Sequence, residues 1–412
     1  MRVLLALILA VALPAATPPT TDDPSPPAFR AQVGIWAPAV EASGESFSNQ
    51  TIRHVVYASS GGTLPRVRVS NLRGTTALAV GHVDLAEQSV GGVAKTGSHQ
   101  RLTFGGSGTV TIPAGQELIS DPADMTVVSG QNLLISIYLP GTTGPSTVHP
   151  AALMNTYVSV AGNHAADDSS ADFSTPRRWS WFFLSGLDVV SSTASGTVVA
   201  FGDSITDGYS SSQLSNRRYP DYLARRLAAQ PGGPKLGVVN AGLAGNMVLR
   251  DRSPTSGGRS ALNRFDHDAL DQPNVRSVIL LEGVNDLTAD TTAAQLQEGY
   301  QQLVDKAHAR GVSVYGGTIL PFGGSTFHNA AREAVRQEVN AWIRNGGAFD
   351  GVIDFDAALR DPADGSRLLP AYAHTDNLHL TDAGMSALAE SVDLSMIVPD
   401  RVPHGLTRPA AV

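Results

Sequence analysis

Hydrophobic and polar positions along the chain follow two different patterns, and the change falls near residue 196. Before it, short β-branched runs alternate with clusters of Gly, Pro, Ser and Asn, and no segment keeps a helical period. These runs lie at 52–57, 66–69, 77–80, 109–112, 133–138 and 181–184. The first pattern predicts an antiparallel all-β sandwich with jelly-roll-like strand spacing.

After residue 196, apolar runs alternate with amphipathic stretches, which is typical of an α/β fold with a doubly wound parallel sheet. Strands are predicted at 197–201, 236–239, 277–281, 313–316 and 351–355. Helices are predicted at 219–230, 260–270, 292–309 and 328–345, and a last one begins near Thr381. The fold class is therefore an α/β domain preceded by a β-sandwich.

The length of 412 residues exceeds a single hydrophobic core and indicates two domains. We predict a signal peptide at 1–16, a Pro-rich linker at 17–27, the sandwich at 28–195, the α/β domain at 196–400 and a tail at 401–412. One positive charge precedes an apolar run too short to span a bilayer, followed by small residues. An uncleaved anchor is the alternative to a cleaved leader, and cleavage predicts a secreted or periplasmic protein.

Charge and cysteine content narrow the possible partners and chemistry. The net charge is −8 and no basic run occurs, which argues against nucleic acid and anionic membranes as main partners. The chain has no cysteine, so disulfides, thiolate catalysis, Cys-based zinc sites and a lipobox anchor are excluded.

Four polar segments carry candidate chemistry. Gly-Asp-Ser at 202–204, Asn-Ala-Gly-Leu-Ala-Gly-Asn at 240–246 and Gly-Val-Asn-Asp at 283–286 each follow a predicted strand, and Asp-Asn-Leu-His occupies 376–379. Strand ends of an open α/β sheet form the ligand-binding edge. The last segment supplies a base and an orienting carboxylate for a serine nucleophile. A helix cap is the alternative role for the serine.

A second Asp-x-x-His pair, Asp305 and His308, means that spacing alone does not identify the base. Both residues lie within a predicted amphipathic helix, where they would form a surface pair. His379 instead precedes a helix start, in a segment that can reach over Ser204. We therefore predict His379 as the base.

The four segments in this order resemble the SGNH/GDSL hydrolase superfamily, and other phrases resemble a secreted bacterial subgroup with an extra N-terminal β domain. The resemblance implies Ser204 as nucleophile, His379 as base and Asp376 as its orienting acid. It also implies an oxyanion hole formed by the N–H groups of Ser204 and Gly245 and the carboxamide of Asn285. It requires no cofactor and no metal.

Several neighbouring residues receive weaker predictions. Phe322 follows a strand end and is predicted to wall the acyl pocket, with core packing as the alternative. Asn246, where many relatives carry Asp, is predicted to contact substrate, and His374 is a weaker substrate candidate. The acids beside catalytic positions, at 203 and 286, are predicted to cap helices or pin loops.

The prediction is a secreted serine esterase that acts on a small ester or an acetylated polysaccharide, most specifically an O-deacetylase of carbohydrate. The alternatives are a lipolytic or aryl esterase with an exposed apolar patch near Phe322 and Met247, and a glycan-binding protein with an inert SGNH domain. Trp36, Tyr138, Tyr157, Trp179 and Trp181 are candidates for a sugar platform or for core packing. No integral membrane association and no particular oligomeric state are predicted.

Overall fold

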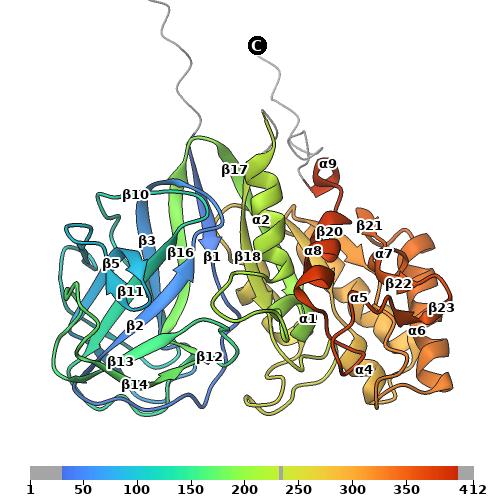
Figure 1. Ribbon diagram of the computed structural model, residues 1–412, viewed down its shortest axis with the longest axis horizontal. Coiled ribbons are helices and arrows are strands. Elements are labelled where there is room, and N and C mark those ends of the chain that lie inside the picture. Colours follow the sequence, from blue (N-terminus) through green and yellow to red (C-terminus); the bar gives the residue numbers. More distant parts are fainter. Residues whose placement is uncertain (1–29, 232–234, 398–412) are drawn as a thin grey trace, which may run out of the picture.

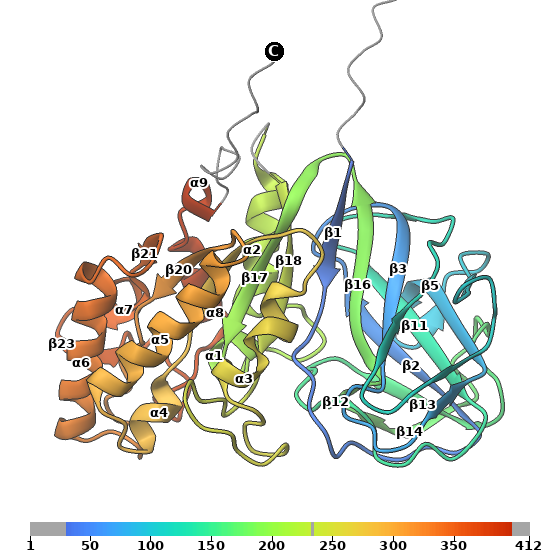
Figure 2. The ribbon, with the colours of Figure 1, turned by 180° about the vertical axis from the view of Figure 1, so that it is seen from behind.

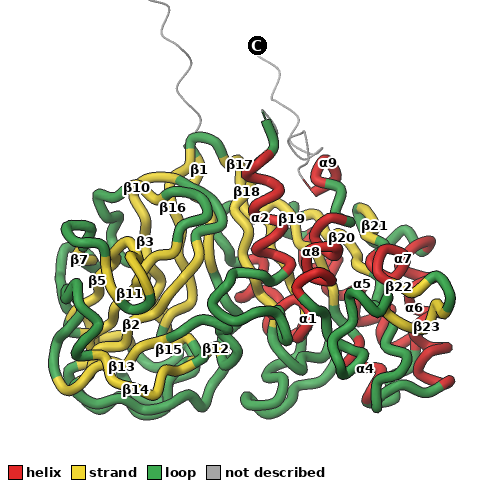
Figure 3. The backbone as a smooth tube through the Cα atoms, viewed as in Figure 1, coloured by secondary structure: helices red, strands yellow, loops and turns green. Residues whose placement is uncertain are grey.

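The computed structural model describes residues 30–231 and 235–397, and it has a β-rich N-terminal half beside an α/β half (Figure 1). The predicted signal peptide, the whole predicted linker and the predicted tail lie outside the described residues. Figure 3 shows that strands dominate the first half, whereas helices and strands alternate in the second. The predicted fold class is confirmed for both halves.

The N-terminal half is built from two main antiparallel sheets. One sheet has the order β1 (Ala31–Trp36), β16 (Leu184–Ser191), β3 (Gly62–Ser70), β10 (Thr126–Val127), with β9 (Glu117–Ile119) also on β3. The other has the order β14 (Phe173–Arg178), β13 (Thr156–Ala161), β2 (Gln50–Tyr57), β11 (Asn132–Leu139), β5 (His82–Val90), β6 (Val93–Ala94), with β7 (Gln100–Leu102) also on β5. Two short pairs complete it, β4 (Leu78–Val80) with β8 (Val110–Ile112) and β12 (Val148–His149) with β15 (Trp181–Phe182). Apolar side chains from both main sheets form one core.

Two sequence predictions about this half change in the structure. The run predicted as one strand at 181–184 breaks at Phe183, whose φ of 53° lies in the left-handed region and cannot continue a strand. Of the aromatic side chains considered for a sugar platform, Trp36, Tyr157 and Trp181 are buried in the core. The rings of Trp36 and Trp181 meet edge to face with centroids 4.9 Å apart, so these side chains pack the sandwich.

The C-terminal half has a five-stranded parallel sheet in the order β18 (Lys235–Gly242), β17 (Ala194–Gly202), β19 (Val275–Leu281), β20 (Ser313–Gly317), β21 (Gly351–Ile353). Helices α2 (Tyr219–Ala229), α8 (Asp382–Glu390) and α9 (Leu394–Ile397) share one hydrophobic core with the sheet. Helices α3 (Ala261–Phe265), α5 (Ala293–His308) and α6 (Ala330–Asn345) share the other, and Figure 2 shows them on the opposite face. A π-helical turn at Asp266–Leu270 extends α3. The order, with β17 between β18 and β19, gives a topological switch point beside β17.

Short elements complete the α/β half and change one predicted boundary. They are α1 (Ser204–Asp207), α4 (Val284–Thr288), α7 (Phe355–Leu359), β22 (Arg360–Asp361) and β23 (Asp364–Leu368). The strand predicted at 351–355 ends earlier, because the side chain of Asp354 accepts a hydrogen bond from the N–H of Ala357 and caps α7. No helix within the described ranges is long and apolar enough to cross a lipid bilayer.

The two halves pack directly against each other where β1 approaches the edge strand β18. A Cβ atom placed on Gly237 would lie 2.1 Å from the carbonyl oxygen of Gly34, so this contact requires a glycine. The N–H of Gly34 donates to Oγ1 of Thr197, and the N–H of Val238 donates to Oγ of Ser59, both at 2.9 Å. These contacts hold the β-sandwich against the sheet that carries the candidate site.

A further link between the halves is an ion pair that depends on pH. Nε2 of His267 lies 3.0 Å from Oε2 of Glu117, and its Nδ1 lies 2.6 Å from Oδ1 of Asp268. Burial alone would lower the pKa of His267, but the hydrogen bonds to Asp268 and Glu117 outweigh it and raise the pKa to about 10. The imidazolium is therefore favoured by folding.

We expect His267→Gln to lower the free energy of unfolding in a pH-dependent way. A histidine whose pKa rises on folding contributes its full stability below its ordinary pKa of 6.5, and that contribution is lost as the pH rises toward about 10. Urea unfolding of both proteins between pH 6 and pH 10 measures the difference. A difference that stays constant over this range would contradict the assignment.

Candidate active site

Ser204 lies at the carboxyl edge of the central strands, in the first turn after β17. Gly202 makes the sharp exit possible, because a Cβ there would lie 2.1 Å from the carbonyl oxygen of Leu281 on β19. Asp203 then caps α1, with its Oδ1 accepting from the N–H of Ile205 at 2.9 Å. The strand, the glycine and the cap together fix the position of the Ser204 hydroxyl.

A hydrogen-bonded chain joins Ser204 to the Asp-x-x-His segment. Oγ of Ser204 lies 2.8 Å from Nε2 of His379, and Nδ1 of His379 lies 2.6 Å from Oδ2 of Asp376. The carbonyl oxygen of His379 accepts a hydrogen bond from the N–H of His374, and this bond closes the loop that contains Asp376. The geometry is that of a hydroxyl, a base and a carboxylate that orients the base.

Asp376 is held as a carboxylate that faces the imidazole. Partial burial acts to raise its pKa, but the hydrogen bonds from the His379 ring and from the N–H groups of His379 and Leu378 outweigh burial and lower the pKa to about 2. Its Oδ1 accepts both backbone bonds, at 2.9 and 3.0 Å, so Oδ2 remains for the ring. The carboxylate is thus ionised and correctly aimed at neutral pH.

Two more side chains border this chain. The ring of Tyr209 packs against that of His379 with centroids 4.5 Å apart, and about half of Tyr209 is exposed. The sequence reasoning missed Tyr209, although it lies five residues after Ser204. His374, the weaker candidate, is half exposed with Nδ1 3.6 Å from Oδ1 of Asp376, so it borders the acid rather than Ser204.

The segments predicted to stabilise an oxyanion follow β18 and β19, the two neighbours of β17. Gly245 adopts a φ of 78°, which favours glycine, and Asn285 lies in the first turn of α4. Nδ2 of Asn285 donates one hydrogen bond to the carbonyl of Asn246 at 2.9 Å, which ties the two segments together. Within the described ranges, the N–H groups of Ser204 and Gly245 have no protein acceptor.

Two predicted substrate contacts are contradicted by the structure. The side chain of Asn246 is fully buried: its Nδ2 donates to the carbonyls of Gly257 and Arg259, and its Oδ1 accepts from Arg264. No atom of it is left for a substrate. Phe322 is also fully buried and belongs to the core beneath α5 and α6. Phe322 follows β20 as predicted, but its ring points into the core.

Arg264 is a buried organising residue that the sequence reasoning also missed. Its guanidinium donates to the carbonyls of Gly202 and Ala241 and to Oδ1 of Asn246, each at 2.8 Å. It therefore joins the ends of β17 and β18 to residues 243–249, which follow β18 and which we call the Gly245 segment. The same group lies over the ring of Phe201, at 3.9 Å from its centroid.

Buried carboxyl groups surround this arginine behind the nucleophile. Burial raises the pKa of Asp203 to about 7 and that of Asp286 to about 6, and it raises the pKa of Glu282 as well. Asp286 nevertheless pins the Gly245 segment, because it accepts from the N–H groups of Val248 and Leu249. The predicted structural roles of Asp203 and Asp286 match these contacts.

The other predicted candidate base, His308, is not near Ser204. It ends α5 and its Nε2 lies 2.8 Å from Oδ2 of Asp350. Among the described residues, one cluster has a metal-ligand composition: His164, Asp167 and Asp172, in and beside the loop that joins β13 to β14 of the sandwich. It includes none of the residues around Ser204.

Part of the chain is similar to known proteins. The model of the GDSL-like Lipase/Acylhydrolase family matches residues 200–387. Among solved structures, a lipase/acylhydrolase from Enterococcus faecalis shares 23% identity over 47% of this chain and 92% of its own, with a TM-score of 0.36. An aryl esterase from M. smegmatis shares 18% over 47% and 95%, with a TM-score of 0.38. No curated protein matches the chain.

Proposed function

We propose that the protein is an ester hydrolase that works as a serine esterase through Ser204, His379 and Asp376, and the match of residues 200–387 to the GDSL-like Lipase/Acylhydrolase family supports this. The observation that carries the proposal is the continuous hydrogen-bonded chain from the Ser204 hydroxyl through the His379 ring to Asp376. Such a chain provides a nucleophile, its base and the group that orients and charges the base.

The reaction follows from these positions. Nε2 of His379 takes the proton of Ser204 as Oγ attacks the ester carbonyl, and the N–H groups of Ser204 and Gly245 with the Asn285 carboxamide stabilise the oxyanion. The imidazolium protonates the leaving alcohol, which leaves an acyl-enzyme on Ser204. A water molecule, deprotonated by His379, then attacks the acyl group, and the acid departs as Ser204 regains its proton.

A finer proposal is that the protein is exported and removes short acyl groups, chiefly acetyl, from carbohydrate. Burial of both Phe322 and Met247 supports it, because a long-chain esterase would need an exposed apolar surface at this position. The exposed ring of Tyr209 beside His379 offers an amphipathic face of the kind that packs against a sugar ring. The attached β-sandwich and the leader-like sequence at 1–16 are consistent with an extracellular polymer as substrate.

Hydrolysis of p-nitrophenyl esters of increasing chain length, together with acetate release from acetylated xylan, tests this proposal. We expect the highest kcat/KM for acetyl and release of acetate from the polymer, both absent in Ser204→Ala. Preference for long acyl chains without release from polymer would move the function to a lipolytic esterase. No hydrolysis of any ester by the intact protein would favour a binding protein with an inert domain.

A further inference from the structure

We propose that His149 of the β-sandwich is a positioning residue of the esterase site, acting through Asp207 on the segment that carries Gly245. The inference rests on the proposed function, because it concerns the same oxyanion site. It assigns the sandwich a part in catalysis that does not depend on glycan binding.

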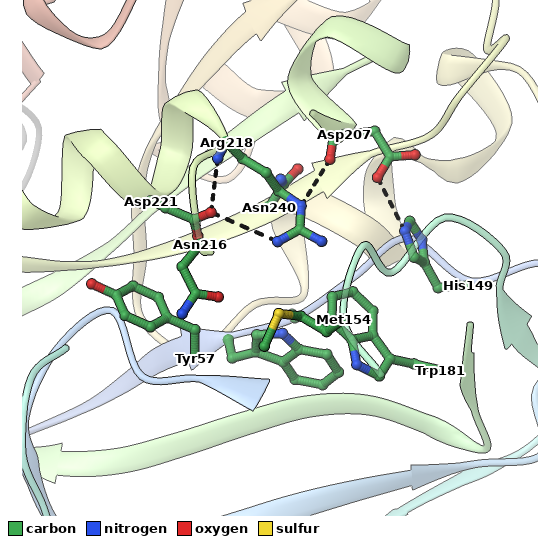
Figure 4. A pocket seen from close by; sticks show the side chains of 11 residues that line it. Tyr57, His149, Met154, Trp181, Asp207, Asn216, Arg218, Asp221 and Asn240 are labelled. Carbon is green, nitrogen blue, oxygen red and sulfur yellow. Dashed lines mark hydrogen bonds and ion pairs between the residues drawn. The ribbon is translucent and has the colours of Figure 1, made fainter. Parts of the chain in front are cut away.

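His149 reaches across the junction between the two halves (Figure 4). It lies on β12 and is 2% exposed, with its Nδ1 2.8 Å from the carbonyl oxygen of Ala39. Its Nε2 lies 3.1 Å from Oδ1 of Asp207, the last residue of α1. Asp207 is also buried, so this pair forms a link between the halves from which solvent is excluded.

Asp207 also contacts the Gly245 segment, which is predicted to supply part of the oxyanion hole. Its second oxygen, Oδ2, accepts from the N–H of Ala244 at 3.0 Å, and Ala244 directly precedes Gly245. Asp207 itself lies three residues after Ser204 in the same short helix. One carboxylate therefore holds the helix of the nucleophile, the Gly245 segment and the sandwich in a fixed relation.

Both ring nitrogens of His149 are used in contacts between fixed partners. A carbonyl oxygen can only accept, so Nδ1 donates to Ala39, and this bond turns Nε2 toward Asp207. A buried carboxylate that loses such a partner is strongly destabilised.

Among the residues that the structure describes, His149 is the one side chain that contacts the carboxyl group of Asp207. The ring of Trp181 packs on the imidazole, with centroids 5.3 Å apart, and Arg218 uses its Nε on the backbone carbonyl of Asp207 rather than on the carboxylate. Asp221, next to Arg218, is the other acid facing this space. The adjoining cavity has a volume of about 30 Å³, which is too small for bulk solvent.

His149→Ala in the full chain tests the inference with p-nitrophenyl acetate as substrate. We expect kcat to fall about 10- to 100-fold with little change in KM, because a displaced Gly245 N–H weakens transition-state stabilisation, and loss of one oxyanion donor costs about 10²- to 10³-fold. His99→Ala is the matched control, since His99 bridges Asp84 and Asp168 within the sandwich alone. Its kcat should equal that of the wild type.

Two substitutions of Asp207 separate positioning from folding. In Asp207→Asn, the amide oxygen still accepts from Ala244 and the amide nitrogen donates to Nε2 of a neutral His149, so kcat should stay within about threefold of the wild type. Asp207→Ala breaks both contacts, and its kcat should fall as in His149→Ala. Circular dichroism identifies folded variants, and the comparison of Asn with Ala decides the matter if His149→Ala does not fold.

The outcomes distinguish this inference from the proposed function. Unchanged kcat in folded His149→Ala, an effect on KM alone, or equal losses in Asp207→Asn and Asp207→Ala would overturn the positioning role. Retained activity in Ser204→Ala would overturn the proposed function itself. Loss in Ser204→Ala and His149→Ala, with rescue in Asp207→Asn, supports both.

Discussion

Ser204→Ala is expected to lower kcat/KM for p-nitrophenyl acetate by about 10⁴-fold or more, the scale seen when a serine nucleophile is removed from a hydrolase. The substitution deletes only Oγ, which is 2.8 Å from Nε2 of His379, and keeps the Ser204 N–H for the oxyanion. The cap by Asp203 is a backbone and carboxylate contact, so α1 should form as before. The loss should therefore lie in chemistry and leave folding unchanged.

Ser211→Ala is the matched control for this experiment, because Ser211 is equally buried and lies on the segment just after α1. It should retain wild-type kcat/KM. A fluorophosphonate reagent, which transfers its phosphonyl group to an activated serine and releases fluoride, should add one adduct to the wild type and none to Ser204→Ala. Full activity in Ser204→Ala, or an adduct on another residue, would contradict the assignment of the nucleophile.

The parts of the site that the sequence predicts are those that depend on local geometry. A glycine-bounded turn after a buried strand places Ser204 at the sheet edge, and a spacing of three residues lets Asp376 orient His379. The cap at Asp203 is equally local. In each case the partners are close in the chain or share one sheet edge, so pattern and spacing suffice.

The parts that sequence reasoning misses depend on side-chain direction and on contacts between distant segments. Asn246 and Phe322 follow strand ends, yet both side chains point into the core. The sequence pattern at a turn places a residue near the site but does not determine which way its side chain points. Arg264 lies in a predicted helix, a position that is typical of a surface cation. In the structure its side chain is buried, because it donates hydrogen bonds to carbonyl groups at the ends of two strands. His149 belongs to another domain, and no spacing rule connects it to Asp207.

His379→Ala is expected to reduce kcat/KM to nearly the level of Ser204→Ala, because a nucleophile and its base act as one unit and their losses are not additive. Asp376 has a pKa of about 2 and stays ionised at assay pH, but it is oriented toward the ring and cannot replace the base at Ser204. The double variant should therefore lose little more than either single variant. Rates of p-nitrophenyl acetate hydrolysis by the two single variants and the double variant, measured over one common pH range, provide the comparison.

His308→Ala is the matched control, since it removes the histidine of the other Asp-x-x-His pair. His308 ends α5 and bonds to Asp350, away from Ser204, so wild-type kcat/KM is expected. Activity that survived His379→Ala and disappeared in His308→Ala would transfer the role of base to the second pair. Strictly additive losses for Ser204→Ala and His379→Ala would mean that the two side chains act independently, against the 2.8 Å contact that joins them.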